Sequence, residues 1–254
     1  GVKIAEGGIA HTVEEAVQRS REIDGNVWVV KAQIHSGARG KAGGIKVCKT
    51  HPEVEAAATA LLGKKLVTHQ TVLAGKLCSK LYIEAGTEIA RELYLSFLID
   101  RSHERVIMVG SAQGGMEIER LAATDPNAIV KIHIEPAVGL QDFQARTMAF
   151  ALGLGEDLLN HAVKTIKGCY RALRDLDANI LEINPLVVTK NNELMALDAK
   201  MSFDENALFR RQKISELRDK TQIDQREVAA GEAGLSYVGL EGDIGCMING
   251  AGLA

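Results

Sequence analysis

The sequence predicts an α+β protein, in which antiparallel sheet is mixed with helices, rather than a doubly wound parallel sheet. Two apolar, strand-like runs at 92–100 and 105–109 are separated only by the polar residues 101–104. Such a short polar connection is typical of an antiparallel hairpin. A second hairpin is predicted from strands at 180–188 and 194–198, which flank a turn containing two asparagines.

Helices are predicted between these strands. Residues 12–23 have helical periodicity, with Thr12 as a possible N-cap and Glu15 three positions later, which is the capping-box pattern. The polar stretch 206–226 is predicted to be a surface helix and linker before a final strand. Further helices are predicted at 53–62, 142–152 and 156–174, and further strands at 27–34, 80–84 and 129–134.

The composition is that of a globular protein with a sizeable core. The 254 residues are 46% apolar and 25% charged, with a formal net charge of -3. No global positive field therefore draws the chain to nucleic acid or to anionic lipid, and no apolar run is long enough to span a membrane. The four cysteines are scattered and the N-terminus lacks a secretory signal. A reducing compartment is expected, either the cytoplasm or, in a eukaryote, the mitochondrial matrix.

Both ends of the sequence are abrupt. It begins at Gly1 instead of methionine, and residues 243–254 have the pattern of a strand that enters a glycine turn. Such a turn usually precedes a helix. We therefore expect a fragment of a longer protein.

The stretch VVKAQIHSGARGKAGGIKV, at 29–47, begins as a strand and continues into glycine and positive charge. Glycines allow backbone N–H groups to converge on an anion, although many such loops are simply solvated hairpin tips. The two commonest phosphate motifs are absent here. Lys31, however, lies within the strand, where a lysine is costly to bury without an anionic partner. Phosphate binding by Lys31 and a flexible glycine-rich flap is favoured over a solvated tip.

A second candidate site is formed by Glu182 and Asn184, in the stretch EINP, together with Asp198. Residues two apart on a strand point to the same face. If the hairpin loop is 190–192, Asn184 lies directly opposite Asp198, whereas another loop length would shift the register. An exposed polar face is the alternative. Two carboxylates and an amide oxygen that converge are better explained as Mg²⁺ ligands.

A third candidate is the segment YIEAGTEIARE at 82–92, where small residues and acids separate two strands. It is either a plain solvated connection or a hinge whose backbone and carboxylates contact an adenine and a ribose. The histidines lack metal-binding spacing, and no nucleophile signature is present. We therefore expect no covalent nucleophile on this chain.

The motifs together resemble the β subunit of ADP-forming succinate–CoA ligase, also called succinyl-CoA synthetase. The matching stretches follow the family's order along almost the whole chain: VVKAQIHSGARGKAGGIKV, YIEAGTEIARELYLSFLIDR, GGMEIE, LEINPLVVTK, LDAKMSFDENALFR and GLEGDIGCMINGAGLA. The resemblance implies an ATP-grasp domain at 1–230, without its short N-terminal segment. It also implies that 231–254 is the truncated start of a flavodoxin-like α/β CoA-ligase domain.

The resemblance also assigns residue roles. Mg²⁺ ligation falls to Asn184 and Asp198, with Glu182 as a nearby catalytic carboxylate, and organic-acid binding falls to Asn249. Ala38 stands where the family often has glycine, and a backbone N–H contact survives that change if φ is negative. Lys41 and Lys46 are interpreted as solvated. Nucleotide contacts are implied for Lys31, Ala38, Arg39, Gly40, Glu84, Thr87 and Glu92.

The implied reaction needs a partner. In the resembling family, Mg²⁺ and ATP, or GTP, exchange a phosphoryl group with a histidine on an α subunit, in an α–β or α2–β2 assembly. The phosphohistidine phosphorylates a small dicarboxylate, and CoA then displaces phosphate to form the thioester. This chain then contributes positioning and charge neutralisation.

The acid substrate is less firmly indicated. The stretches GARGKAGGIK, EPAVGLQDFQAR and LDAKMSFDENALFRR are more similar to the malate–CoA ligase branch than to the succinate enzymes of the tricarboxylic acid cycle. Two other functions remain open, a carboxylate–amine ligase with the same domain and a non-catalytic nucleotide-binding module. The former does not end in GCMINGAGLA.

Overall fold

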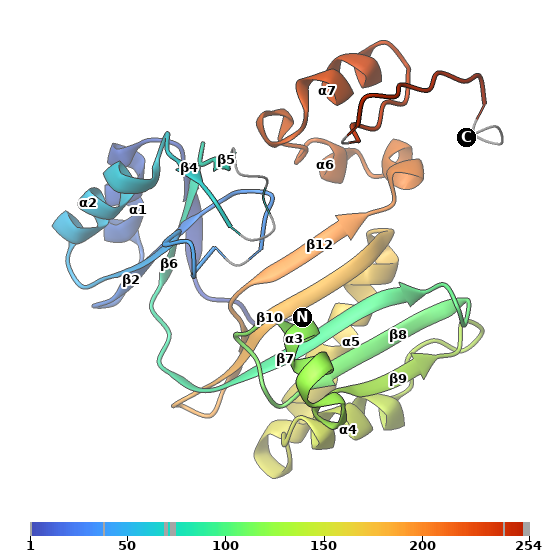
Figure 1. The fold of residues 1–254 in the computed structure, drawn as a ribbon. Coiled ribbons are helices and arrows are strands. Elements are labelled where there is room, and N and C mark those ends of the chain that lie inside the picture. The colour runs from blue at the N-terminus through green and yellow to red at the C-terminus, as the bar shows by residue number, and fades with distance from the viewer. Residues whose placement is uncertain (1, 38, 69–70, 72–74, 241, 251–254) are drawn as a thin grey trace. The chain divides into compact units, whose positions relative to one another are not determined.

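The computed structural model describes residues 2–37, 39–68, 71, 75–240 and 242–250. The chain divides into two compact units, 1–217 and 218–254. The first unit contains two large antiparallel sheets, each covered by helices on one face, and one small two-stranded sheet (Figure 1). The α+β prediction is therefore confirmed.

The first sheet has four strands in the order β1-β6-β2-β3. Its helices are α1, Val13–Glu22, and α2, His51–Leu61. Side chains alternate across β2: Trp28 and Val30 pack into the core with α2, so the side chains between them point to the other face. The strands are β1 (Gly7–Ala10), β6 (Leu81–Ala85), β2 (Trp28–Ala32) and β3 (Ile45–Cys48).

The second sheet has the order β11-β10-β7-β8-β9, and β12 also pairs with β10. Its core lies against α4, Asp142–Ala151, and α5, Leu159–Asp175. Gly110 on β8 leaves room for α4, because a Cβ there would lie 2.4 Å from the Met148 sulfur. The strands are β7 (Ile89–Asp100), β8 (Arg105–Ser111), β9 (Val130–Ile134), β10 (Ala178–Thr189), β11 (Leu194–Ala196) and β12 (Ala199–Phe203).

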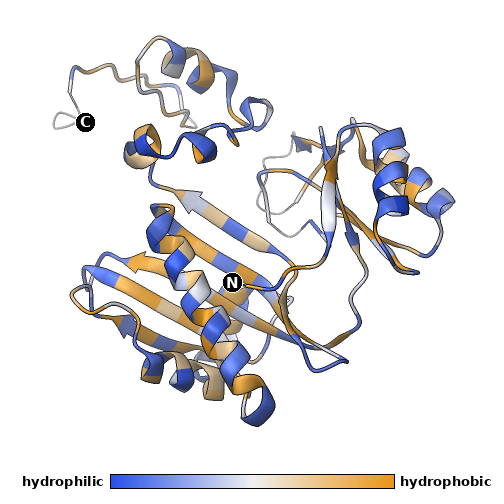
Figure 2. Ribbon diagram, turned by 180° about the vertical axis from the view of Figure 1, so that it is seen from behind, coloured by the Kyte–Doolittle hydropathy of each residue, from blue (hydrophilic) through white to orange (hydrophobic). Residues whose placement is uncertain are grey.

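Helix α5 shows why these residues form an amphipathic helix. Its buried residues recur every three or four positions, so one side packs on the sheet while the other faces solvent. Figure 2 shows this side of the sheet, with hydrophobic and hydrophilic residues mixed along α5. The buried residues are Ala162, Thr165, Ile166, Cys169 and Leu173.

Both predicted hairpins and the first helix cap are confirmed. Strands β7 and β8 pair through the register Asp100 to Arg105, and β10 and β11 through Val188 to Leu194. The Thr12 side chain accepts a hydrogen bond from the Glu15 N–H at 3.1 Å. These features depend on short stretches of chain, which is why the local sequence predicts them.

The segment 206–226, predicted to be a surface helix and linker, contains no single continuous helix. The segment forms separate short turns, because the side chains of Asp204, Asp219 and Asp224 each accept a hydrogen bond from an N–H two residues later and start a new turn. These pieces are the 3₁₀ turns Glu205–Arg210 and Lys220–Gln222 and the helices α6 (Gln212–Ser215) and α7 (Gln225–Glu232).

The predicted final strand is also wrong for 242–250, which contain no strand among the residues that the structure describes. The second unit has no buried apolar side chain among its described residues, so nothing packs a strand there. The predicted domain boundary at 230 stays a prediction. Within the described part of the chain, no helix combines the length and the apolar character that crossing a membrane requires.

Smaller elements complete the first unit. They are the two-stranded sheet of β4 (Lys65–Leu66) and β5 (Lys76–Leu77), the helix α3 (Ile118–Thr124), and the 3₁₀ turns Pro126–Ala128 and Glu156–Leu158.

Candidate functional site

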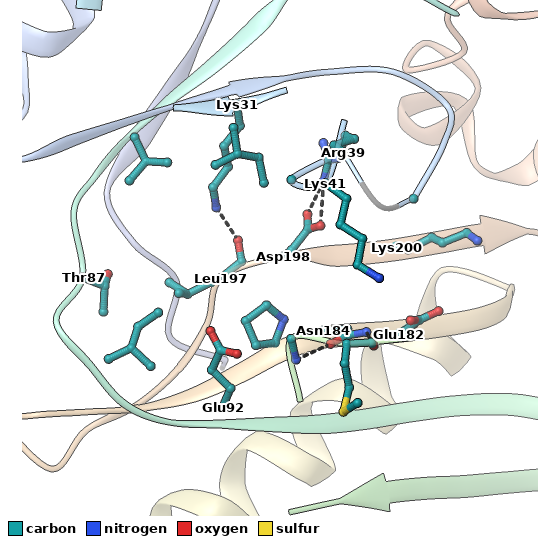
Figure 3. Close-up of a pocket in the computed structure, with 18 of the residues that line it drawn as sticks. Lys31, Arg39, Lys41, Thr87, Glu92, Glu182, Asn184, Leu197, Asp198 and Lys200 are labelled. Atoms are coloured by element: carbon teal, nitrogen blue, oxygen red, sulfur yellow. Dashed lines mark hydrogen bonds and ion pairs between the residues drawn. The ribbon is translucent and has the colours of Figure 1, made fainter. Parts of the chain in front are cut away.

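A cavity of about 480 Å³ lies between the two sheets of the first unit, lined by faces that their helices do not cover (Figure 3). Of the predicted site residues, Ala38 is outside the described residues, and Asn249 is exposed in the second unit. The others all line the cavity: Lys31, Arg39, Gly40, Glu84, Thr87, Glu92, Glu182, Asn184 and Asp198.

Lys31 and Glu84 form a buried ion pair at the floor of the cavity. Strand β2 places Lys31 opposite Tyr82 of β6, so Glu84 is its diagonal neighbour on the same face. The Lys31 ammonium group contacts the Glu84 carboxylate and donates to the Leu197 carbonyl oxygen at 2.8 Å. Burial raises the pKa of Glu84, and the Lys31 charge opposes that effect. The strand lysine therefore has an anionic partner within the protein.

Arg39 holds the predicted metal ligand Asp198. Its Nη2 donates to both carboxylate oxygens of Asp198 at 2.6 Å, and its Nη1 donates to the Ala32 carbonyl oxygen at 3.0 Å. The Arg39 side chain is 12% exposed, whereas that of Asp198 is 42% exposed. The Arg39 guanidinium of the glycine-rich flap is thus paired with the Asp198 carboxylate, which lines the cavity.

The register of β10 places two of the predicted Mg²⁺ ligands, Asn184 and Asp198, opposite each other. The pairs Leu186–Ala196 and Ile183–Ala199 lie on either side of Asn184, and both place Asn184 opposite Asp198. The Asn184 N–H donates to the Asp198 carbonyl oxygen at 3.2 Å. The expected juxtaposition is therefore present, and it requires the three-residue loop at 190–192.

Glu182 lies on the same face, two residues before Asn184. Burial raises the pKa of the Glu182 carboxyl group, while the positive charge of Lys200 acts in the opposite direction. Lys200 is the direct cross-strand partner of Glu182 on β12. In Figure 3 these two side chains lie along the strands toward one end of the cavity.

The stretch GGMEIE forms a loop that closes one wall of the cavity. Gly115 has a φ of 69°, and its N–H donates to the Asn184 side-chain oxygen at 2.9 Å. The Asn184 amide in turn donates to the Met116 carbonyl oxygen at 2.9 Å. A Cβ on Gly115 would lie 1.9 Å from the Glu92 carboxylate. Gly115 therefore allows Glu92 and the loop to approach closely.

The predicted hinge connects the two sheets. Residues 86–88 separate β6 from β7, and Thr87 and Glu92 line the cavity from this connection and from the strand that follows. The Thr87 hydroxyl contacts the Met195 sulfur at 3.7 Å.

Lys41 is largely exposed, as predicted, with 66% of its side chain accessible. It also forms an ion pair with Glu117 at 2.7 Å and lines the cavity, which the sequence did not indicate. Sequence reasoning also missed Lys200 and Leu197. Lys41 and Glu117 are 76 positions apart, so only the tertiary fold brings them together. Lys46 is exposed, as expected.

The residues present fit a divalent cation. The carboxylates of Glu182 and Asp198 and the side-chain oxygen of Asn184 are hard ligands of the kind that Mg²⁺ uses. The side-chain amide oxygen of Asn184 accepts only one described hydrogen bond and has a second lone pair. Asp198 already holds a positive group, the Arg39 guanidinium, at its cavity side.

Comparison with curated proteins shows high similarity over the whole chain. The probable malate–CoA ligase subunit beta of Mesorhizobium japonicum is 59% identical over 254 residues, which are 100% of this chain and 64% of that protein. The succinate–CoA ligase [ADP-forming] subunit beta of Staphylococcus saprophyticus is 51% identical over 100% of this chain and 66% of its own length. The chain thus spans a little under two thirds of both relatives.

Comparison with solved structures supports the fold. ATP citrate lyase from Methanothrix soehngenii has a TM-score of 0.64 and 17% identity, covering 89% of this chain and 52% of that chain. The dinucleotide-forming acetyl-coenzyme A synthetase 1 of Ca. Korarchaeum cryptofilum has a TM-score of 0.58 and 18% identity, covering 80% of this chain and 87% of that chain. The ATP-grasp domain family matches residues 1–188. With this match, and with the two sheets that enclose the cavity, the chain belongs to the ATP-grasp family.

Proposed function

We propose that this chain is the nucleotide- and Mg²⁺-binding part of the β subunit of an ADP-forming dicarboxylate–CoA ligase. The observation that carries the proposal is the single cavity that nine of the eleven predicted site residues line. The names of the curated relatives support it, since they are β subunits of malate–CoA and succinate–CoA ligases. Those names also imply an α subunit as partner. Because these relatives are bacterial, a cytoplasmic location is proposed with the function.

The nucleotide phosphates lie near Lys31 and Arg39 in this proposal. Both side chains reach the cavity from β2 and the flap, and both now contact carboxylates. On nucleotide binding, phosphate oxygens replace or join those carboxylates as acceptors of charge-assisted hydrogen bonds. Gly40 allows close backbone approach, while Glu84, Thr87 and Glu92 face the adenosine part.

Asn184 and Asp198 are proposed to hold Mg²⁺, with Glu182 nearby. A bound Mg²⁺ supplies charge neutralisation of the β- and γ-phosphate oxygens. The chain's own residues orient the phosphates: the Gly115 N–H fixes the Asn184 amide at 2.9 Å, and the cross-strand register fixes its separation from Asp198. Asn184 therefore lies on β10, and Asp198 lies in the two-residue connection between β11 and β12 that faces it.

The phosphoryl acceptor is proposed to be a histidine of the partner α subunit. The γ-phosphoryl group leaves ADP and joins that histidine, and it then passes to a carboxylate of the substrate. The CoA thiol displaces phosphate to give the thioester. The sequence agrees with this division, because it carries no nucleophile signature of its own. Positioning and electrostatic stabilisation are the contributions of this chain.

Malate is the proposed acid, and ATP the proposed nucleotide, with GTP as the alternative. The higher identity of the malate–CoA ligase relative, 59% against 51% for the succinate enzyme, supports malate. Malate differs from succinate by one hydroxyl group, and a site built to bind a hydroxyl group discriminates strongly against its absence.

The test is a coupled assay of the full-length β subunit with its α partner, CoA, Mg²⁺ and ATP. We expect acyl-CoA and ADP with malate, at a higher kcat/KM than with succinate. No thioester from either acid contradicts the ligase, and a strong preference for succinate contradicts only the malate assignment. Nucleotide binding by this chain without any turnover in the complete complex indicates instead a non-catalytic nucleotide-binding module.

A further inference from the structure

A second cluster of ligand-type side chains lies outside the cavity. Asp100, His103 and His133 present one ligand atom each, and these atoms lie within 4.8 Å of one another. His103 Nδ1 is 2.7 Å and His133 Nε2 is 3.1 Å from the same oxygen of Asp100, Oδ2. The two imidazole rings have centroids 4.5 Å apart. No step of the proposed ligase reaction uses these residues.

The cluster is separate from the nucleotide cavity. Asp100 is the last residue of β7, whereas Glu92, which lines the cavity, lies eight residues earlier on the same strand. At about 3.3 Å per residue, the two positions are about 26 Å apart. Ligand binding at the cluster therefore does not require ligand binding in the cavity.

The three side chains come from the end of β7, from the β7–β8 turn and from β9. Asp100 ends β7, and its Oδ1 accepts a hydrogen bond from the Ser102 N–H at 2.9 Å, which leaves Oδ2 directed at the imidazoles. His103 lies in the tight turn to β8, where the next residue, Glu104, has a φ of 53°. His133 lies on β9, and its carbonyl oxygen accepts a hydrogen bond from the Gln144 side chain at 2.9 Å.

The nearby positive charge does not oppose a cation strongly. The Arg105 guanidinium donates to the His103 carbonyl oxygen at 2.9 Å and to the Glu135 carboxylate at 3.1 Å. Its charge is therefore paired with the Glu135 carboxylate.

The donor set is the kind that transition ions select. Imidazole suits Zn²⁺, Ni²⁺ and Cu²⁺, whereas Mg²⁺ and Ca²⁺ prefer oxygen ligands alone. Tetrahedral Zn²⁺, with bonds of about 2.0–2.1 Å, places its ligand atoms about 3.3–3.4 Å apart. To reach that separation, the contacts of 2.7 and 3.1 Å lengthen by about 0.6–0.7 Å and 0.2–0.3 Å respectively. Side-chain exposures of 20% for Asp100 and 60% for His103 leave an entry path.

We propose that Asp100, His103 and His133 form a surface site for a divalent transition ion, with Zn²⁺ as the best-fitting ion and water as the fourth ligand. Each neutral imidazole binds through the nitrogen that now contacts Asp100, and its proton occupies the other ring nitrogen. The bound ion links the β7–β8 turn to β9.

The experiment is a calorimetric titration of the metal-free chain with ZnCl₂ in excess Mg²⁺, which fills oxygen-only sites. We expect one site in the wild type that weakens by at least about tenfold in His103→Ala and in His133→Ala, since even second-shell changes cost about 10–100-fold in metal affinity. The control is His161→Ala, which removes an exposed histidine of α5. It should bind Zn²⁺ as the wild type does.

Two further measurements separate the outcomes. The Asp198→Asn variant should still bind Zn²⁺. If this variant loses Zn²⁺ binding, the ion binds in the nucleotide cavity and the proposal is overturned. X-ray absorption at the zinc edge of the wild type does not depend on any variant folding correctly. Two imidazole nitrogens in the first shell support the proposal, and a shell of oxygen alone contradicts it.

Discussion

The Lys31 ammonium group contacts the Glu84 carboxylate and the Leu197 carbonyl oxygen, and these contacts replace much of its solvation. The side chains of Lys31 and Glu84 are only 9% and 6% exposed. Removing one member of such a pair leaves the other charge buried without compensation. Lys31 therefore has a structural role in the ligand-free protein in addition to the proposed phosphate contact.

We expect Lys31→Ala to lower the free energy of unfolding by about 3–5 kcal/mol, as breaking a buried pair does. The double variant Lys31→Met with Glu84→Gln should recover most of that stability, because it removes both charges and retains side-chain volume. It should still fail to bind Mg²⁺-nucleotide. Chemical denaturation and nucleotide titration measure the two effects. Restored nucleotide binding in the double variant would contradict the phosphate role of Lys31.

Glu182 gives a pH-dependent prediction. Its pKa in the folded protein is raised above the ordinary value of 4.5 by burial, so its contribution to stability is present below that value and is lost as pH rises through the folded pKa. Because glutamine does not ionise, the Glu182→Gln variant does not lose this stability as the pH rises. The variant should match the wild type in acid and exceed its free energy of unfolding at pH 7, while its turnover falls.

The control for this experiment is Glu55→Gln, which neutralises an exposed carboxylate on α2. It should leave the difference between acid and neutral pH unchanged. A gain from Glu182→Gln that is independent of pH would show that ionisation of Glu182 is not its cause.

At the scale of elements, the glycine-rich flap and the β10–β12 region are joined through one arginine. Arg39 donates to both oxygens of Asp198. Under the proposed function, we expect a cation that binds Asp198 to weaken or displace this contact, which makes Arg39 available to a phosphate. We then expect the flap to exchange a carboxylate partner for a phosphate partner when Mg²⁺ and nucleotide bind together.

Arg39→Gln should change two affinities in opposite directions. Mg²⁺ alone should bind more tightly because Asp198 is released, whereas Mg²⁺-nucleotide should bind at least about tenfold more weakly, since a hydrogen bond to a charged group contributes about 1.5–3 kcal/mol. Lys46→Gln is the matched control, because it removes one exposed positive charge from β3. Titration calorimetry measures both. Weaker binding of Mg²⁺ alone in Arg39→Gln would rule out the exchange.

The element scale also shows which features the sequence could predict. The loop at 190–192 fixes the pairing of Asn184 with Asp198, because antiparallel register follows from loop length. The helix cap at Thr12 and the β7–β8 hairpin are equally local. These contacts lie within about 15 positions, where spacing and turn chemistry determine which atoms meet.

Contacts between distant elements could not be predicted in the same way. Lys31 and Glu84 were each identified as site residues, but their pairing requires that β2 and β6 be neighbours, which follows from the sheet order β1-β6-β2-β3. The Lys41–Glu117 pair depends on the approach of the flap to the loop before α3. The imidazoles of His103 and His133 lack any recognisable sequence spacing and converge only because β8 lies between β7 and β9.

At the scale of the whole molecule, the two units differ in whether their described residues form an apolar core. The first unit contains both sheets and their apolar cores, and it holds the cavity. The second has no buried apolar side chain among its described residues. The proposed organic-acid residue Asn249 belongs to this second unit, whereas the described residues among the predicted nucleotide contacts line one cavity; both assignments stay predictions.

The paired charges of the cavity have a consequence for how a ligand arrives. Lys31, Arg39 and Lys41 each contact a carboxylate, from Glu84, Asp198 and Glu117 respectively. Their fields largely cancel a short distance away, so the cleft exerts little long-range attraction on a polyanion in solution. Capture of the nucleotide then depends on diffusion into the cleft followed by exchange of ionic partners inside it, and not on steering from a distance.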